Sequence, residues 1–217
     1  MIMIYTYHQE NLYRKEAMKL LVFDLETRKL NTDLRPDNPE EGWDALKRGE
    51  GGISCLMIWD DTEKWMSIYD DKTILAGAMH LESADLLIGF HTIGFDIPVI
   101  EGVLGRKLQI KQHYDIYAEI SKANAHMGVI GRKGEFTLDA VARRAFGRGK
   151  NGHGANITVL LKEQRYGELF NYCANDVRLT RDLFEYIREN NGIPSTNNRF
   201  LTLAVPDWLK QPVEDKC

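Results

Sequence analysis

KLLVFDLET, residues 19–27, is a short apolar run that ends in carboxylates, which is the pattern of a buried β-strand. Asp24 and Glu26 lie two residues apart in this run, so on a strand their side chains leave from the same face. Two carboxylates about 4 Å apart repel each other by about 4 kcal/mol at an effective dielectric constant of about 20. We therefore expect a compensating cation nearby, unless this is a solvated strand end that carries ordinary acids.

Two further acids stand among apolar residues. Asp96 lies in GFHTIGFDIPVI, residues 89–100, where it is either a buried acid or the N-cap of the helix that follows. Asp176 lies in LFNYCANDVRLTRDLF, residues 169–184. On a helix, Tyr172 and Asp176 are one turn apart and both leave from the apolar side. A tyrosine–aspartate hydrogen bond at the edge of the core is the alternative interpretation.

Together the chain offers four carboxylates from three distant segments. Four buried acids would be strongly unfavourable without cations. Two divalent ions would balance the four negative charges, and oxygen-only ligands favour Mg²⁺ or Mn²⁺ over zinc. Two such ions, about 3.5–4 Å apart, form the arrangement that enzymes use for in-line attack on a phosphodiester. The sequence thus predicts two Mg²⁺ or Mn²⁺ ions at this site.

Apolar periodicity predicts the order of the other elements. The segment 28–52, rich in Pro, Gly, Asn and Asp, is expected to be a long connection. Strands followed by alternating helices indicate an α/β architecture with a mixed sheet. The expected strands are 53–60, 65–70 and 85–90, with a late strand or an extended tail at 199–208. The expected helices are 73–82, 97–104, 136–147, which is capped by Thr137 and ended by Gly147, and 168–190 as one or two helices.

Composition limits the class of protein. The chain has 217 residues, of which 43% are hydrophobic and 28% are charged, which suits one globular domain with a short appendage and excludes disorder throughout. No window approaches 18 uninterrupted apolar residues, so no membrane span is expected. Three scattered cysteines and an opening without the pattern of a secretory signal favour a reducing, cytoplasmic location.

Charge is uneven along the chain. The net charge of −4 argues weakly against a protein that coats nucleic acid by bulk charge. Residues 132–150, however, carry six cationic side chains against two acidic ones. This basic stretch is either a solvated face or a surface that follows a nucleic-acid backbone.

Three short motifs carry a family resemblance. FDLET (23–27), HTIGFD (91–96) and YCAND (172–176) resemble, in this order, the three exonuclease motifs of the DEDD superfamily. The YxxxD pattern marks the tyrosine branch of that superfamily. The chain is similar to the ribonuclease-H-like 3′–5′ exonucleases, which include the proofreading domains of family A and B DNA polymerases. This resemblance implies an α/β ribonuclease-H-like fold with a mixed central sheet flanked by helices.

The resemblance also implies a division of the chain. It covers residues 18–190, which leaves 1–17 as an N-terminal extension and 191–217 as a C-terminal tail. A polymerase palm does not fit in the remainder. We therefore expect a free-standing metal-dependent 3′–5′ exonuclease, with a polymerase or replication protein in another chain as a partner. Its substrate is expected to be the 3′ end of DNA or RNA, with single-stranded DNA favoured and no membrane involved.

Roles follow from the resemblance residue by residue. It implies that Asp24 bridges both metal ions, that Glu26 and Asp176 hold the first ion, and that Asp96 serves the second. Tyr172 is expected to orient the attacking water, because an isolated tyrosine, with a pKa of about 10, is a poor base.

Three more residues are candidates for contact with the nucleic acid. These are Thr27, His91 and Phe95. His91 stands where family B members often carry asparagine, and an ordinary core or surface histidine is the alternative. Phe95 could support a terminal base, but its apolar neighbours favour a place in the core.

Two other functions fit parts of the pattern. A non-catalytic exonuclease-fold module could bind nucleic acid or a replication or repair protein. A haloacid-dehalogenase phosphatase needs an aspartate where Glu26 stands, so it is disfavoured. Asp115 is a spare acid, which we interpret as structural and as the substitute if Asp96 is not a ligand.

Overall fold

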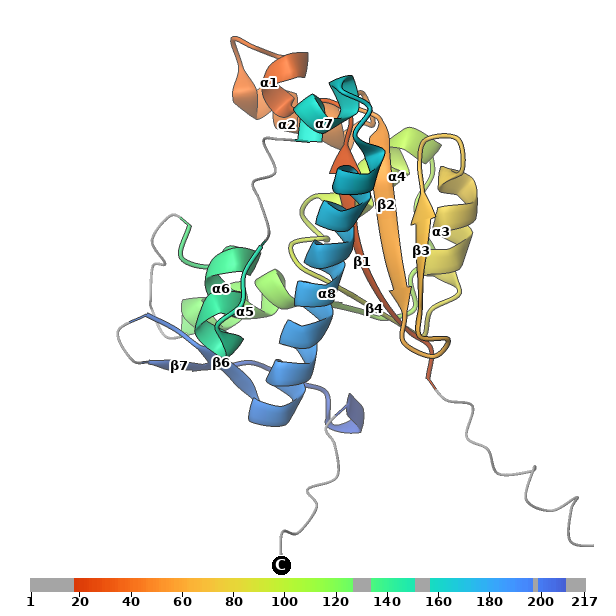
Figure 1. The fold of residues 1–217 in the computed structure, drawn as a ribbon. Helices are drawn as coiled ribbons and strands as arrows, with labels where there is room; N and C mark the ends of the chain where they lie inside the picture. Colours follow the sequence, from red (N-terminus) through yellow and green to blue (C-terminus); the bar gives the residue numbers. More distant parts are fainter. Residues whose placement is uncertain (1–17, 127–133, 151–156, 197–198, 210–217) are drawn as a thin grey trace, which may run out of the picture.

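The fold is built on one mixed sheet. The computed structural model describes residues 18–126, 134–150, 157–196 and 199–209. The strand order is β3-β2-β1-β4-β5, with β1 antiparallel to β2 and parallel to β4. Helices cover both faces of the sheet (Figure 1), so the expected α/β fold with a mixed central sheet flanked by helices is confirmed. The strands are β1 Leu20–Thr27, β2 Ile53–Asp60, β3 Trp65–Tyr69, β4 Leu86–Gly89 and β5 His113–Asp115.

The helices follow the strands in the expected alternation, with several additions. None of the helices in the described residues is long and apolar enough to cross a membrane. The predicted helices at 73–82, 97–104, 136–147 and 168–190 are all present within one or two residues. Within the described residues the α-helices are α1 Asn31–Leu34, α2 Pro39–Lys47, α3 Ile74–Glu82, α4 Asp96–Leu104, α5 Ile116–His126, α6 Leu138–Phe146, α7 Ile157–Lys162 and α8 Tyr166–Asn190.

Strand β1 separates two apolar layers. Leu21, Phe23 and Leu25 face the layer that contains residues of α3 and α4. Val22 faces the opposite layer, which contains the buried residues of α8. Because side chains alternate along a strand, the even-numbered acids of β1 leave the sheet on the side of Val22 and α8. Helix α8 lies beside β1 in Figure 1, so the alternation directs the two carboxylates toward this long helix.

The expectation of an irregular connection at 28–52 is wrong, since this segment holds α1 and α2. Helix α2 begins with Pro39 in its first turn, and the Asn38 side chain accepts a hydrogen bond from the Glu41 N–H at 3.3 Å. The helix buries only Gly42, Ala45 and Leu46. So short a helix with so small a buried face leaves little apolar periodicity in the sequence.

The chain beyond α8 is folded as well. Two short strands, β6 Gly192–Pro194 and β7 Phe200–Thr202, pair with each other and pack against α5, α6 and α8. Ile193, Leu201 and Leu203 are buried in the layer on the α8 side of the sheet. The segment expected to be a tail therefore adds to the core in its described part, and the last described residues form a single 3-10 turn, Asp207–Leu209. The proposed extension 1–17 lies outside the described residues.

Candidate metal centre and active site

Three carboxylates from two distant elements meet at one point. Asp24 and Glu26 on β1 and Asp176 on α8 each offer an oxygen atom, and these atoms lie within 4.8 Å of one another. Asp176 is only 1% exposed, and its Oδ1 has no hydrogen-bond partner among the described residues. Buried polar atoms rarely lack a partner, so this oxygen needs an explanation. A divalent ion would supply one, and carboxylate oxygens are the ligands that Mg²⁺ and Mn²⁺ prefer.

The pKa values of the clustered acids also indicate a site for a cation. Burial raises the pKa of Asp24 well above its usual value, and the charges of Asp96, Asp176 and Glu26 raise it further. Burial likewise raises the pKa of Glu26 to about 8. Crowded acids of this kind hold protons at neutral pH unless a cation stabilises their charged forms. The protein alone thus leaves the cluster short of positive charge.

One cation of the chain reaches the cluster. The Lys150 ammonium forms an ion pair with Asp176 and lies 5.6 Å from the centre of the Tyr172 ring. The Lys150 backbone N–H donates to Asp139 Oδ1 at 2.7 Å, which fixes the start of the side chain. Although burial lowers the pKa of Lys150, Asp176 and Asp24 raise it above its usual value. Sequence reasoning counted Lys150 only as part of the basic stretch, since no spacing links it to Asp176.

Tyr172 lies one turn before Asp176 on α8, as the helical spacing predicted. Its side chain is buried beside Asp176. Burial raises the pKa of Asp176, and Lys150 and Tyr172 oppose this rise. Burial and the charge of Asp176 raise the pKa of Tyr172 far above its usual value. The phenol therefore stays protonated at neutral pH, so it can orient a neighbouring group but does not act as a base.

Asp96 is buried beside the cluster but is held by the backbone of β1. Its Oδ1 accepts a hydrogen bond from the Leu25 N–H at 3.0 Å. Strand β4 pairs with β1 only as far as Val22, so Asp96 takes an N–H that β4 leaves unpaired. Burial raises the pKa of Asp96 to about 7. Helix α4 begins at Asp96, with Phe95 as its N-cap, so of the two alternatives for Asp96 the structure shows the buried acid and not the N-cap.

The candidate contacts to nucleic acid come from the end of β1 and from the segment that leads into α4. The Thr27 hydroxyl donates to the Lys29 carbonyl at 2.7 Å. His91 is exposed, has a φ of 67°, and packs edge-on against Tyr117 with ring centres 4.7 Å apart. Phe95 is half-buried, so it is neither fully exposed nor deep in the core.

Asp115 shapes the loop that carries His91. Its two oxygens accept hydrogen bonds from the N–H groups of His91, at 2.9 Å, and Ile93, at 2.8 Å. The N–H of Ala118 also donates to Asp115, at 3.2 Å. These contacts agree with the structural role expected for this acid.

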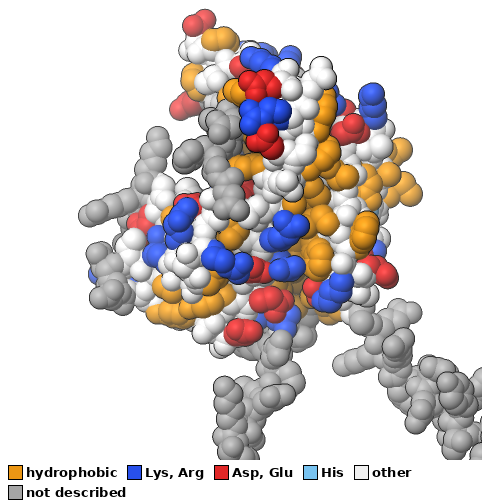
Figure 2. Space-filling model, in the orientation of Figure 1, with side chains coloured by type: hydrophobic (Ala, Val, Ile, Leu, Met, Phe, Trp, Pro, Cys, Tyr) orange, Lys and Arg blue, Asp and Glu red, His pale blue; other side chains and the backbone are white. Residues whose placement is uncertain are grey.

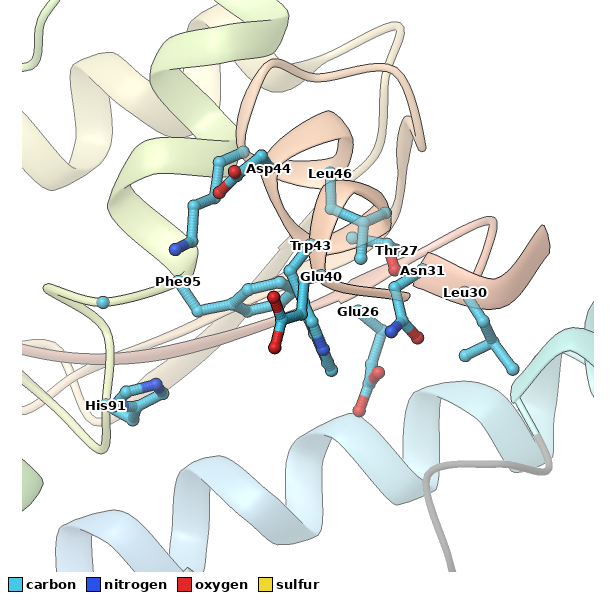
Figure 3. Close-up of a pocket in the computed structure, with 12 residues that line it drawn as sticks. Glu26, Thr27, Leu30, Asn31, Glu40, Trp43, Asp44, Leu46, His91 and Phe95 are labelled. Atoms are coloured by element: carbon cyan, nitrogen blue, oxygen red, sulfur yellow. The ribbon is translucent and has the colours of Figure 1, made fainter. Parts of the chain in front are cut away.

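A cavity of about 720 Å³ adjoins Glu26. Thr27, His91 and Phe95 all line it, so the structure brings the three candidate contacts together beside the acids (Figure 3). Trp43, from α2, also lines it and packs edge-on against Phe95, with ring centres 5.6 Å apart. Sequence reasoning missed Trp43 because it lies in the segment expected to be irregular.

The basic stretch is largely engaged within the molecule. Arg143 pairs with Asp139 and Arg148 pairs with Asp182, while Arg144 donates to backbone carbonyls. Basic and acidic side chains alternate over this face in Figure 2. Residues 132 and 133 lie outside the described part of the chain.

Comparison with known proteins gives one kind of likeness. No family model and no curated protein matches the sequence. The fold resembles the solved structure of the family B DNA polymerase from the hyperthermophilic archaeon Pyrobaculum calidifontis, with a TM-score of 0.57 and 18% sequence identity. The match covers 79% of this chain and 24% of that polymerase, so the chain spans about a quarter of its length. At this identity the likeness shows a distant, polymerase-related fold.

Proposed function

We propose that this chain is a metal-dependent 3′–5′ exonuclease. The observation that carries the proposal is the meeting of Asp24, Glu26 and Asp176 within 4.8 Å, beside a cavity large enough for one nucleotide. The likeness to a family B DNA polymerase and the three motifs support it. Each motif lies in the element that its spacing predicted: a buried strand end, a helix start and a long helix.

Each side chain of the site would have its own role in catalysis. Asp24, Glu26 and Asp176 would hold the metal, and Asp96 would support a second ion from its position beside β1. Divalent ions at such a site lower the pKa of water and stabilise the charge that develops on phosphate. Tyr172, protonated and one turn from Asp176, would orient the attacking water.

The cavity suggests how the substrate is held. Its volume of about 720 Å³ lies in the range of about 300–1,000 Å³ that accommodates one small molecule. One nucleoside would fill it, with Phe95 beside the base and Thr27 and His91 along the edges. A nucleotide at the end of a paired duplex would have to unpair to enter, which favours single-stranded 3′ ends.

The test is the release of mononucleotides from a 5′-labelled oligonucleotide with Mg²⁺ or Mn²⁺. We expect D24N and D176N to lower the rate by at least about 100-fold, since each removes a metal ligand. E41Q is the matched control, because Glu41 is an acid on α2 that pairs with Arg35 and does not line the cavity. Full activity of D176N would refute the proposal.

One observation favours the non-catalytic alternative, a module that binds nucleic acid or a replication or repair protein. Lys150 already neutralises part of the acidic cluster without a metal. If this pairing is permanent, the chain should bind oligonucleotides equally well with EDTA and with Mn²⁺ and should release no nucleotides. Metal-dependent release of nucleotides would exclude this alternative.

A further inference from the structure

Helix α2 contributes two side chains to the cavity that lie outside the three motifs. In Figure 3 the carboxylate of Glu40 and the indole of Trp43 point from α2 into the space above α8. Trp43 is 48% exposed, although it packs edge-on against Phe95. A large aromatic side chain left half open in a cavity is available to a flat, uncharged ligand.

The position of α2 is fixed by close backbone contacts. A Cβ on Gly42 would overlap the carbonyl oxygen of Asn31, and a Cβ on Gly102 of α4 would overlap the carbonyl oxygen of Lys47. Both glycines therefore allow contacts that any other residue would prevent. The wall that carries Glu40 and Trp43 is thus held in place before any ligand binds.

The charge of the cavity determines which part of a nucleotide enters it. Among the described residues, Glu26, Glu40 and Asp44 line the cavity, and Lys47 is the one lysine or arginine beside them. A phosphate would be repelled there, whereas a nucleoside carries no charge. The terminal phosphodiester would then lie at the acidic cluster and its nucleoside in the cavity.

We infer that α2 selects the terminal nucleobase of the substrate: Trp43 stacks on the base, and Glu40 accepts a hydrogen bond from an exocyclic amine. This inference rests on the proposed exonuclease function. An ionised carboxylate can only accept hydrogen bonds. Cytosine and adenine present an amino group at the position where thymine and uracil present a carbonyl oxygen. The chain should therefore favour 3′ ends that carry cytosine or adenine.

The sharpest test compares two oligonucleotides that differ only in a terminal deoxycytidine or deoxyuridine, and so in the amino or carbonyl group at C4 and in the hydrogen that uracil carries on N3. We expect the parent to release dCMP about tenfold faster than dUMP, the effect of one hydrogen bond to a charged group. In E40Q the ratio should fall to about one, because an amide can donate as well as accept. E41Q should keep the parent's ratio. Equal rates in the parent, or an unchanged ratio in E40Q, would overturn the inference.

Trp43 gives an independent readout. W43A should raise the KM for both oligonucleotides by about tenfold, because base stacking on an aromatic side chain is worth about 1–3 kcal/mol. W43F should restore most of the affinity. A KM in W43A equal to that of the parent would contradict the stacking role.

The two proposals fail in distinguishable ways. If the parent degrades both oligonucleotides at one rate, the exonuclease proposal stands and base selection falls. If the parent releases no nucleotide with any divalent metal, the exonuclease proposal falls. The relative affinity for dCMP and dUMP in the presence of Mn²⁺, measured by calorimetry, then decides base selection: tighter binding of dCMP that E40Q abolishes supports it, and equal binding overturns it.

Discussion

Replacing Lys150 by methionine tests the electrostatics of the acidic cluster. K150M keeps an unbranched side chain but removes the ammonium that pairs with Asp176, which is only 1% exposed. Removing one partner of a buried ion pair costs about 3–5 kcal/mol. The Lys150 side chain is 27% exposed, and the acids can take up protons. We therefore expect the free energy of unfolding to fall by about 2–3 kcal/mol. For a chain of this size that lowers Tm by about 4–12 °C.

The assay is thermal unfolding with EDTA and with saturating Mg²⁺. In EDTA we expect the full decrease in the Tm of K150M. In Mg²⁺ we expect a much smaller decrease, because bound ions would replace the missing charge. Titration calorimetry should also show tighter Mn²⁺ binding, since Lys150 no longer competes for Asp176. K111M is the matched control: Lys111 pairs with Asp85 at the surface, with side chains 58% and 43% exposed, and its loss should change Tm by less than about 3 °C. A K150M variant as stable as the parent in EDTA, or destabilised equally in both buffers, would refute the reasoning.

Three other perturbations have expected outcomes. Burial raises the pKa of Glu26 to about 8 and of Asp96 to about 7, so the metal-free folded chain holds more protons than the unfolded chain between about pH 4 and pH 8. Its Tm in EDTA should therefore fall as pH rises through this window, and a rising Tm would contradict these shifts. D115A removes an acceptor of three backbone N–H groups; it should cost about 2–4 kcal/mol in a denaturant titration, and an unchanged midpoint would argue against its structural role. G42A should lower stability by about 1–3 kcal/mol by the same measurement and weaken the preference for terminal cytosine, because α2 must move away from Asn31; retention of both would show that α2 is not tightly held.

The acids of β1 and the Tyr172–Asp176 pair were predictable because each follows from a local period. Alternation along a strand fixes the shared face of Asp24 and Glu26, and helical spacing fixes the shared face of Tyr172 and Asp176. These two faces lie opposite each other only because of the strand order and because α8 covers that side of the sheet. Local patterns do not contain this information, so the convergence of the acids was a hypothesis, which the family resemblance supported.

The missed parts have physical reasons as well. Asp96 accepts from Leu25 because β4 stops pairing with β1 after Val22, and sequence patterns do not show where pairing ends. Lys150 reaches Asp176 because Asp139 of α6 holds the Lys150 backbone beside α8, a contact between elements that no sequence spacing shows. Trp43 was overlooked because α2 buries mostly small residues and so resembles a polar loop in composition.

The alternation of side chains along β1 determines both the solubility of the protein and the position of its acids. A shift of one residue in this strand would turn Asp24 and Glu26 into the layer beneath α3 and α4 and turn Phe23 and Leu25 toward α8. Neither layer tolerates that exchange, so a chain with a single-residue insertion or deletion in β1 should aggregate rather than survive as an inactive protein. In a random mutant library, a soluble but inactive variant with a change in β1 should therefore keep the native register of this strand. Its activity would be lost because a side chain was replaced, not because the carboxylates were displaced.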